Sequence, residues 1–309
     1  MATNSGNEQV LLGIPKGSLQ ESTLALFARA GFSFYGSERS LWLSSNDPDL
    51  RPVLLRPQEM PTYVADGRLD AGFAGWDWVC ETRAQDGLRI LADLCYSKRS
   101  FRPVQWVLAV HKDSPYQTVD DFQSLGPTPK RISTELKSLT EEWLAERGIV
   151  AEVDFSWGAT EAKVPAFADA IVECTETGSS LRANGLRILD TVIESTTQFF
   201  ANKQVYRNND WKRRKLDAIA LLLKSCLEAD VKVTVRVVAP ADKVAAMTPL
   251  IPAGAGVTIT PGLNGSQVLD LVIEKQQSRD LIPELARCGA TTISVAAIGM
   301  LFESAPTPG

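Results

Sequence analysis

The sequence predicts an α/β protein with two small α/β lobes, followed by a domain in which strands and helices alternate in the order βαββαβ. Three observations support this prediction. Apolar strand patterns before residue 103 run into glycine-containing turns and helical patterns, the same alternation begins again after Pro103, and residues 211–309 contain four further strand patterns. A chain of 309 residues has room for two or three such domains.

The composition argues against several classes of function. With 44% hydrophobic and 22% charged residues, the chain has the balance of a globular protein. Its single histidine, His111, argues against a His-based metal site and against hydrolysis through a Ser–His or Cys–His pair. A formal net charge of -5 fits poorly with nucleic-acid binding, which needs clustered Lys and Arg, so no nucleic-acid partner is expected.

The expected compartment is the cytoplasm. The polar N-terminus lacks the basic start and apolar segment of a signal peptide. No apolar run approaches the ~18–20 residues that span a bilayer, so no membrane association is expected. The five cysteines show no C-x-x-C spacing, and an odd number of isolated cysteines is typical of a reducing compartment.

The first strand pattern, at residues 10–14, leads into a turn that contains Lys16 and Gly17 and then into a helical pattern. Ser18 and Glu21 have the spacing of a capping box, which predicts that this turn lies at a helix N-terminus. Free N–H groups and a Lys side chain at such a position can bind an anion. An ordinary strand–turn–helix explains the same residues.

Two more strand patterns complete the first block. Residues 53–55 precede a short helix that ends at Gly67, and residues 69–77 form a strand, a glycine turn and the start of a helix. Repeated strand-to-helix turns with glycine favour a layered α/β fold. Asp77 is explained most simply as the cap of its helix.

The second block begins near Pro103. Its strand patterns are residues 105–110, 131–132, 150–155 and 168–174. A helix in this block has an apolar stripe made of Leu136, Leu139, Trp143 and Leu144. Residues 157–163 form a polar turn. This block is therefore expected to be a second small α/β domain.

The C-terminal third begins with a helix at residues 211–227. Alternating valines follow as a strand, and the remaining patterns are a helix at 241–247, strands at 257–260 and 267–273, a helix at 281–287 and a strand at 291–297. This order is that of a ferredoxin-like domain. The segment carries few residues of catalytic type, which favours an accessory or ligand-sensing role.

Residues 169–181 carry the most informative chemistry. A strand with Asp169 and Glu173 runs into a loop of Thr, Gly and Ser, whose N–H and hydroxyl groups can surround a phosphate. A carboxylate before such a loop can accept hydrogen bonds from ribose hydroxyls. The segment therefore suits a phosphorylated sugar, although a polar surface turn has the same pattern. It matches neither the Walker loop nor the Rossmann glycine motif.

Residues 173–186 resemble the phosphoribosyl-pyrophosphate loop of ATP phosphoribosyltransferases, the first enzymes of histidine biosynthesis. Segments 13–19, 56–64, 72–77 and 158–161 are similar to the same family and occur in its order. The βαββαβ tail resembles the regulatory domain of the family's long form.

The resemblance implies transfer of the phosphoribosyl group from phosphoribosyl pyrophosphate to N1 of ATP, with release of pyrophosphate and a requirement for Mg²⁺. The protein's task is then to position the substrates and neutralise charge. The resemblance assigns Lys16, Arg39 and Arg56 to catalysis at the departing pyrophosphate, with Mg²⁺ held mainly by substrate phosphates. The substrate-binding residues that it implies are Glu173, Thr175, Thr177, Gly178, Ser179, Ser180, Leu181, Gly75, Asp77 and Glu161.

The resemblance also implies a two-lobed catalytic unit similar to periplasmic binding proteins, followed by the ferredoxin-like regulatory domain. Lobe I would comprise residues 1–103 and 187–210, lobe II residues 104–186, and the regulatory domain residues 211–309. Residues 187–201 would complete the sheet of lobe I. Histidine would be an effector, and the chain would form a homo-oligomer between a dimer and a hexamer.

The chain departs from the family at three places. Ser18 stands where many members have Arg, Glu173 stands where Asp is common, and residues 297–300 differ from a Pro-Ile-Glu-Lys-Met stretch of many relatives.

Two other functions share some of the features. A two-lobed small-molecule binding protein would have the same lobes, and a base-salvage phosphoribosyltransferase would have a similar loop but usually two adjacent acids before it.

Overall fold

The computed structural model describes residues 8–37, 40–95 and 103–303. The chain divides into two compact units, Met1–Ala220 and Leu221–Gly309. The division falls inside the long helix α8 (Asp210–Val231), ten residues after the domain boundary predicted at residue 211. No helix in the described part of the chain is long and apolar enough to cross a membrane.

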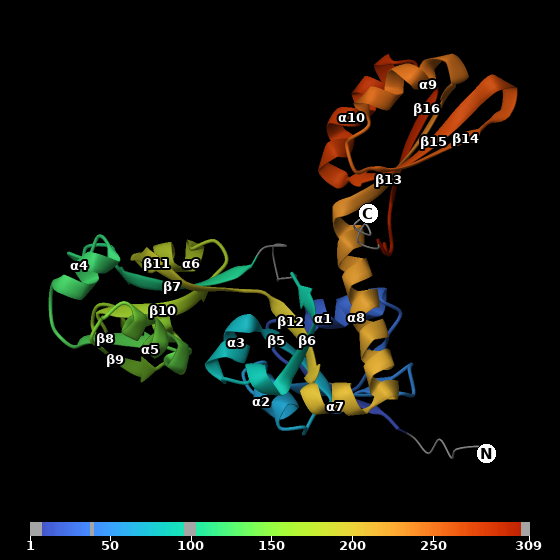
Figure 1. Ribbon diagram of the computed structural model, residues 1–309. Coiled ribbons are helices and arrows are strands. Elements are labelled where there is room, and N and C mark those ends of the chain that lie inside the picture. Colours follow the sequence, from blue (N-terminus) through green and yellow to red (C-terminus); the bar gives the residue numbers. More distant parts are fainter. Residues whose placement is uncertain (1–7, 38–39, 96–102, 304–309) are drawn as a thin grey trace. The chain divides into compact units, whose positions relative to one another are not determined.

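Lobe I of the first unit is built on a five-stranded sheet with the order β4-β1-β5-β12-β6 (Figure 1). Its strands are β1 (Val10–Pro15), β4 (Leu50–Leu55), β5 (Ala71–Gly75), β6 (Leu88–Leu94) and β12 (Thr197–Asn202). β4 and β5 run parallel to β1, and β12 runs antiparallel to β5. Phe73 on β5 stacks on Phe199 of β12, with ring centroids 4.5 Å apart. The strands are apolar on both faces because helices cover them.

The remaining elements of lobe I connect these strands. They are α1 (Gln20–Arg29), β2 (Phe34–Tyr35), β3 (Ser44–Ser45), α2 (Met60–Ala65), α3 (Trp76–Glu81), η1 (Gln85–Gly87) and α7 (Lys203–Asn208). The predicted capping box of α1 is wrong. The helix begins at Gln20 with Leu19 as its N-cap, and no side chain caps it. The Leu19 carbonyl instead accepts the hydroxyl of Thr23, so Ser18 is left in the turn before the helix.

Lobe II has its own five-stranded sheet with the order β11-β7-β10-β8-β9. Its elements are β7 (Val104–His111), α4 (Val119–Ser124), β8 (Lys130–Thr134), α5 (Lys137–Glu146), β9 (Ala151–Phe155), η2 (Thr160–Lys163), β10 (Ala170–Thr175), α6 (Ser179–Ala183) and β11 (Leu186–Ser195). β8 runs parallel to both β9 and β10. Trp106, Ile132 and Trp143 belong to the core on one face of this sheet.

The chain returns from lobe II to lobe I at Thr196, between β11 and β12 (Figure 1). β11 pairs with β7 in lobe II, and only β12 pairs with strands of lobe I. The prediction that residues 187–201 complete the first sheet is therefore correct for β12 and wrong for β11. Both strands are rich in apolar and β-branched residues, and such a pattern does not say which sheet a strand joins.

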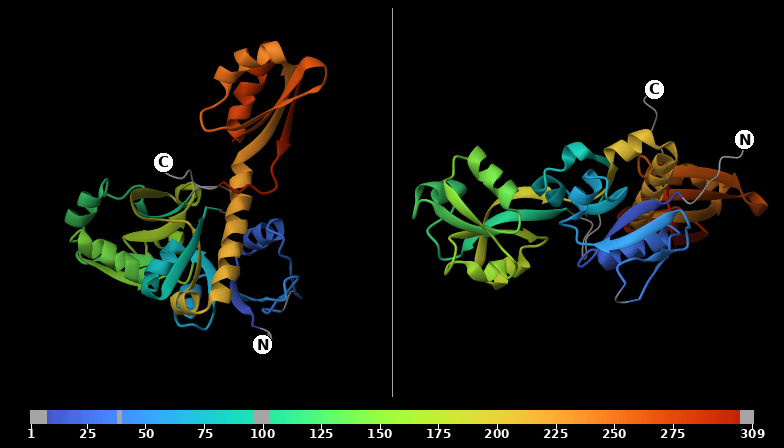
Figure 2. Two further views of the ribbon diagram at one scale, coloured as in Figure 1. Left: turned by 45° about the vertical axis from the view of Figure 1, so that its right-hand side comes forward. Right: turned by 90° about the horizontal axis from the view of Figure 1, so that it is seen from below.

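The second unit contains a four-stranded antiparallel sheet with the order β14-β15-β13-β16. Its elements are β13 (Lys232–Pro240), α9 (Ala241–Met247), η3 (Thr248–Leu250), β14 (Gly256–Pro261), η4 (Leu263–Gly265), β15 (Ser266–Glu274), α10 (Lys275–Arg287) and β16 (Thr292–Ala297). Figure 2 shows both longer helices on one face of the sheet, over a core that contains Val233, Val235 and Val237. The predicted ferredoxin-like order is confirmed.

Candidate active site

A cavity of about 510 Å³ lies in the first unit, at the carboxyl end of the lobe I sheet. The turns that follow β1, β4 and β5 line it with Ser18, Pro57 and Gly75. These three strands are adjacent and parallel, so the turns after them meet at one edge. Crevices at this edge are where α/β sheets bind ligands.

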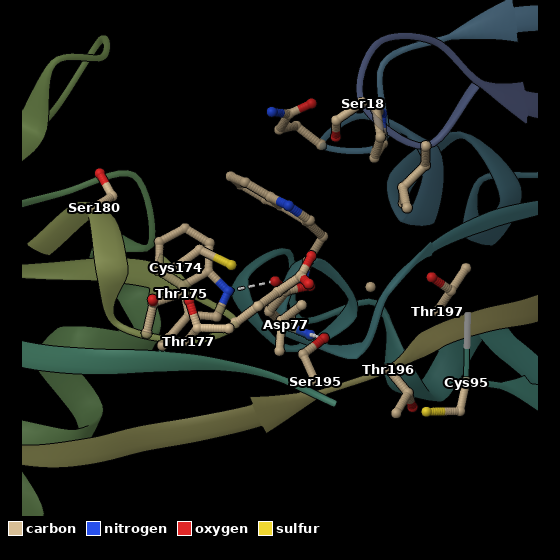
Figure 3. A pocket seen from close by; sticks show the side chains of 18 of the residues that line it. Ser18, Asp77, Cys95, Cys174, Thr175, Thr177, Ser180, Ser195, Thr196 and Thr197 are labelled. Carbon is tan, nitrogen blue, oxygen red and sulfur yellow. Dashed lines mark hydrogen bonds between the residues drawn. The ribbon is translucent and has the colours of Figure 1, made fainter. Parts of the chain in front are cut away.

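The loop that follows β10 in lobe II forms another wall of the same cavity. Its lining residues include Thr175, Thr177, Ser179 and Ser180. Figure 3 shows Thr175, Thr177 and Ser180 on one side of the cavity and Ser18 on another. Hydroxyl-rich residues of lobe II thus face the strand-end turns of lobe I across a shared space.

The conformation of this loop exposes backbone donors. Gly178 has a φ of +69° and is the N-cap of α6, and its N–H donates to the Thr175 hydroxyl at 2.8 Å. Arg182 holds the loop from the other side by donating to the Thr177 carbonyl at 2.9 Å. The first-turn N–H groups of a helix have no intrahelical acceptor, so those of residues 179–181 are available to an anion.

Two glutamates lie beside the loop. Glu161 accepts a hydrogen bond from the Ser180 hydroxyl at 2.7 Å, which brings the 158–161 segment to the loop. Glu173 accepts the Cys174 N–H at 3.0 Å. Burial raises the pKa of Glu173, a hydrogen bond from Thr160 opposes this, and the charges of nearby glutamates add to the rise. Glu173 itself does not line the cavity, but its neighbours Cys174 and Thr175 do.

Asp77 lies at the base of the cavity and is buried (Figure 3). Its carboxylate accepts the Trp78 N–H at 2.8 Å and the indole N–H of Trp106, and its own N–H donates to Ser195 Oγ at 3.1 Å. Burial raises the pKa of Asp77, although these hydrogen bonds oppose the rise. The interpretation of Asp77 as a helix cap is wrong, because Gly75 is the N-cap of α3 and no side chain caps that helix.

Lys16 and Arg56 are exposed residues that directly follow β1 and β4. The Lys16 N–H donates to the Leu55 carbonyl at 2.7 Å, so the two cations leave adjacent strands at the edge where the cavity lies. Neither is a lining residue, whereas Ser18 and Pro57 beside them are. Arg39 lies outside the described residues.

The structure adds residues that the sequence did not single out. Gln58 lines the cavity, and its buried Oε1 has no hydrogen-bond partner within the ranges that the structure describes. Trp106 and Ser195 reach the cavity from β7 and β11. Gln58 belongs to the 56–64 segment, whose resemblance to the family could have indicated a role in the site. Nothing in the sequence links Trp106 or Ser195 to Asp77.

Cys174 is exposed in the cavity wall. The surrounding walls and the charges of Asp77, Glu173 and Glu176 raise the pKa of its thiol to about 12. The thiol is therefore protonated at neutral pH. Within the described residues, no group of three or more His, Cys, Asp or Glu could hold a metal ion.

Comparison with known proteins identifies the family. The family model described as HisG, ATP phosphoribosyltransferase, matches residues 56–225. An ATP phosphoribosyltransferase from Chlorobium luteolum is 47% identical over 302 residues, which cover 97% of this chain and 100% of that protein. The chain belongs to the ATP phosphoribosyltransferase family. The enzyme from Thermodesulfovibrio yellowstonii is 44% identical over 281 residues, 91% of this chain and 94% of its own.

Among solved structures, the ATP phosphoribosyl transferase (HisG:HisZ) complex from Thermotoga maritima contains a similar chain. It has a TM-score of 0.56 and 25% identity, and the match covers 70% of this chain and 99% of that one. As a member of this family, the chain described in Figure 1 catalyses the first step of histidine biosynthesis, as predicted. Its length and its C-terminal domain fit the long form, and its two sheets confirm the predicted two-lobed α/β fold.

Proposed function

We propose that phosphoribosyl pyrophosphate binds across the two lobes, with its 5-phosphate on lobe II and its pyrophosphate toward lobe I. One observation carries this proposal. The loop of residues 175–180 and the turns that follow β1 and β4 line the same cavity. The loop supplies neutral donors and the N-terminus of α6. The two turns begin with the cations Lys16 and Arg56.

On lobe II, the N–H groups of residues 179–181 and the hydroxyls of Thr177 and Ser179 would surround the 5-phosphate. The two hydroxyls already hydrogen-bond to each other at 3.0 Å, so they point to a common place. Glu173 would accept hydrogen bonds from the ribose hydroxyls. Its raised pKa supports this role, because a partly buried carboxylate with nearby like charges gains from added donors.

On lobe I, Lys16 and Arg56 would hold the departing pyrophosphate, with Arg39 as a further cation. In the reaction, adenine N1 forms a bond to C1 of the ribose while the C1–O bond to pyrophosphate breaks and its electron pair leaves with the oxygen. Adenine N1 is already nucleophilic, so no protein base is needed to activate it. The residues act by positioning and by neutralising charge.

We assign Mg²⁺ to the substrate rather than to a protein cage. The absence of a three-ligand cluster among the described side chains fits a cation that is held mainly by phosphate oxygens. When bound, Mg²⁺ would neutralise charge on the pyrophosphate. Glu161 accepts the hydroxyl of Ser180 in the loop and would complete the shell of the cation or contact the nucleotide.

We also propose that the second unit binds histidine as an inhibitory effector, that the protein forms a homo-oligomer from a dimer to a hexamer, and that it works in the cytoplasm. The separate ferredoxin-like unit supports an effector role. Adding free histidine to the assay tests it, and unchanged rates would reject feedback control.

Competition by partial substrates tests the binding mode. The reaction is followed by ultraviolet absorbance with ATP, phosphoribosyl pyrophosphate and Mg²⁺. Ribose 5-phosphate should lose its inhibition in Thr177→Val, and pyrophosphate should lose its inhibition in Arg56→Met. Arg51→Met is the matched control, because Arg51 lies near the amino end of the same strand. Equal effects of each variant on both inhibitors would reject the assignment.

A further inference from the structure

Helix α3 follows a strand of lobe I but packs into the cores of both lobes. Val79 is fully buried in a cluster of lobe I residues. Trp78, one residue earlier, packs against the core of lobe II and lies edge-on to Trp106, with ring centroids 6.3 Å apart. This six-residue helix is therefore a bridge between the two cores.

The first turn of α3 is hydrogen-bonded to the strands of lobe II. The carboxylate of Asp77 accepts the indole N–H of Trp106, and the Asp77 N–H donates to Ser195 Oγ at 3.1 Å. The Trp76 N–H donates to the carbonyl of Thr196, the crossing residue, at 3.0 Å. Both oxygens of Asp77 accept protein donors, which leaves this carboxylate suited to holding the lobes rather than to binding substrate.

The last residue of α3 is bonded to lobe II as well. Glu81 Oε1 accepts the N–H of Ser138 and Oε2 accepts the N–H of Leu139, both at 2.9 Å. These N–H groups belong to the first turn of α5, whose N-cap, Leu136, has no side-chain cap. A carboxylate from lobe I thus caps a helix of lobe II, where the helix dipole also favours negative charge.

The position of α5 gives this cap a further consequence. The helix begins just after β8, which runs parallel to β10, so its start lies at the sheet edge from which the proposed phosphate loop (residues 175–180) also leaves. Fixing that edge against α3 fixes the loop relative to the carboxyl end of β5. β1, which pairs with β5, leads to Lys16, and β4, which pairs with β1, leads to Arg56.

We propose that Glu81 is a positioning residue that, together with Asp77, sets the distance between the phosphate loop of lobe II and the cationic edge of lobe I. This inference rests on the proposed binding of phosphoribosyl pyrophosphate across both lobes. A substrate that spans the lobes senses their separation, whereas a ligand held by one lobe does not. An ordinary structural cap would affect both kinds of ligand alike.

The test compares Glu81→Ala and Glu81→Gln with the wild type. Arg83→Ala is the matched control, because Arg83 follows the same helix and forms an exposed ion pair with Glu142 of α5 at 2.5 Å. In Glu81→Ala, kcat/KM for phosphoribosyl pyrophosphate should fall on the order of 10- to 100-fold, since misplacement of reacting groups by about 1 Å has effects of this size. Glu81→Gln keeps one acceptor and should lie between.

The inhibition constants of ribose 5-phosphate, held by lobe II, and of pyrophosphate, held by lobe I, should stay within about twofold of the wild type in both variants. Circular dichroism confirms that the variants fold. Equal losses for the single-lobe ligands and the whole substrate, or an unchanged kcat/KM in Glu81→Ala, would overturn the positioning role.

A second measurement separates this inference from the proposed binding mode. If neither ribose 5-phosphate nor pyrophosphate inhibits the wild-type enzyme, the proposed binding mode is wrong. The positioning role is then judged from a crystal structure of Glu81→Ala, in which the angle between the two sheets should differ from that of the wild type. The same angle in both structures would reject it.

Discussion

The indole N–H of Trp106, on β7 of lobe II, donates a hydrogen bond to the carboxylate of Asp77, at the start of α3. The two residues are far apart in the sequence and both line the cavity of the candidate active site. Burial raises the pKa of Asp77, and the Trp106 indole is the strongest of the hydrogen bonds that oppose this rise. The charged form of the carboxylate therefore depends on a donor from the other lobe.

Replacing Trp106 tests this dependence. Trp106→Phe removes the donor and leaves a buried carboxylate oxygen short of a partner, so the free energy of unfolding should fall by about 1–3 kcal/mol at neutral pH. Urea unfolding measures the change. Trp143→Phe makes the same substitution in the same core and serves as the control for lost ring volume. Equal losses in the two variants would argue against a contribution from the Asp77 bond.

The raised pKa of Asp77 also predicts how stability depends on pH. Above the ordinary value of 3.8 and up to its folded pKa, the folded protein binds more protons at this group than the unfolded chain does. Its contribution to stability is therefore complete below that ordinary value and is lost as the pH rises through the folded pKa. Asp77→Asn has no such titration.

The wild type should consequently lose stability relative to Asp77→Asn as the pH rises from the ordinary value of 3.8 toward neutral. Thermal unfolding of both proteins across this range measures the difference. Other acids, Glu173 included, are present in both proteins and cancel. A difference that does not change with pH would contradict the prediction.

Gly75 tests the space around Asp77. A Cβ at Gly75 would collide with Asp77 Oδ1 and lie 3.0 Å from Ser195 Oγ. Gly75→Ala should therefore displace the carboxylate, destabilise the protein by about 1–3 kcal/mol and lower the rate of adduct formation. Gly299→Ala is the control, since nothing lies within 4 Å of its added Cβ. Full activity and stability of Gly75→Ala would show that the site relaxes at no cost.

The phosphate loop can be tested with two glycines at the ends of α6. Gly178 has a φ of +69° and Gly185 a φ of +70°, so alanine brings similar backbone strain to both. Only Gly178 lies in the loop. We expect Gly178→Ala to raise the KM for phosphoribosyl pyrophosphate by about tenfold and Gly185→Ala to change it little. Steady-state kinetics compares them, and matching increases would place the phosphate elsewhere.

Gln58 is expected to bind substrate. Its buried Oε1 has no partner in the described part of the protein, and a donor from a ligand, such as an adenine amino group or a ribose hydroxyl, would satisfy it. Gln58→Leu should leave the unfolding free energy unchanged or slightly raised, because an unsatisfied polar group is lost. The KM of one substrate should rise by about tenfold, and unchanged KM values for both would exclude a contact.

Local patterns in the sequence predicted most of the longer strands, although not β6, as well as the loop after β10 and the βαββαβ unit, because each depends on neighbouring residues. The loop is an example, since its glycine, threonines and serines are consecutive. The capping box at Ser18 and Glu21 failed because α1 starts later than the motif requires. The pairing of β11, and the meeting of Trp106, Ser195 and Asp77, arise from tertiary packing, which no local pattern contains.

The strand order of lobe I has a consequence for synthesis of the chain on the ribosome. β12 lies between β5 and β6, so β6 joins the sheet through a strand that is made only after the whole of lobe II. At about 5–20 residues per second, the roughly 100 residues between β6 and β12 take on the order of 5–20 s to emerge. During this interval the edge of β5 that later pairs with β12 still lacks that partner strand, and this position in the sheet of lobe I stays unfilled. The second lobe, which is continuous in sequence, can pair all five of its strands before that position is filled.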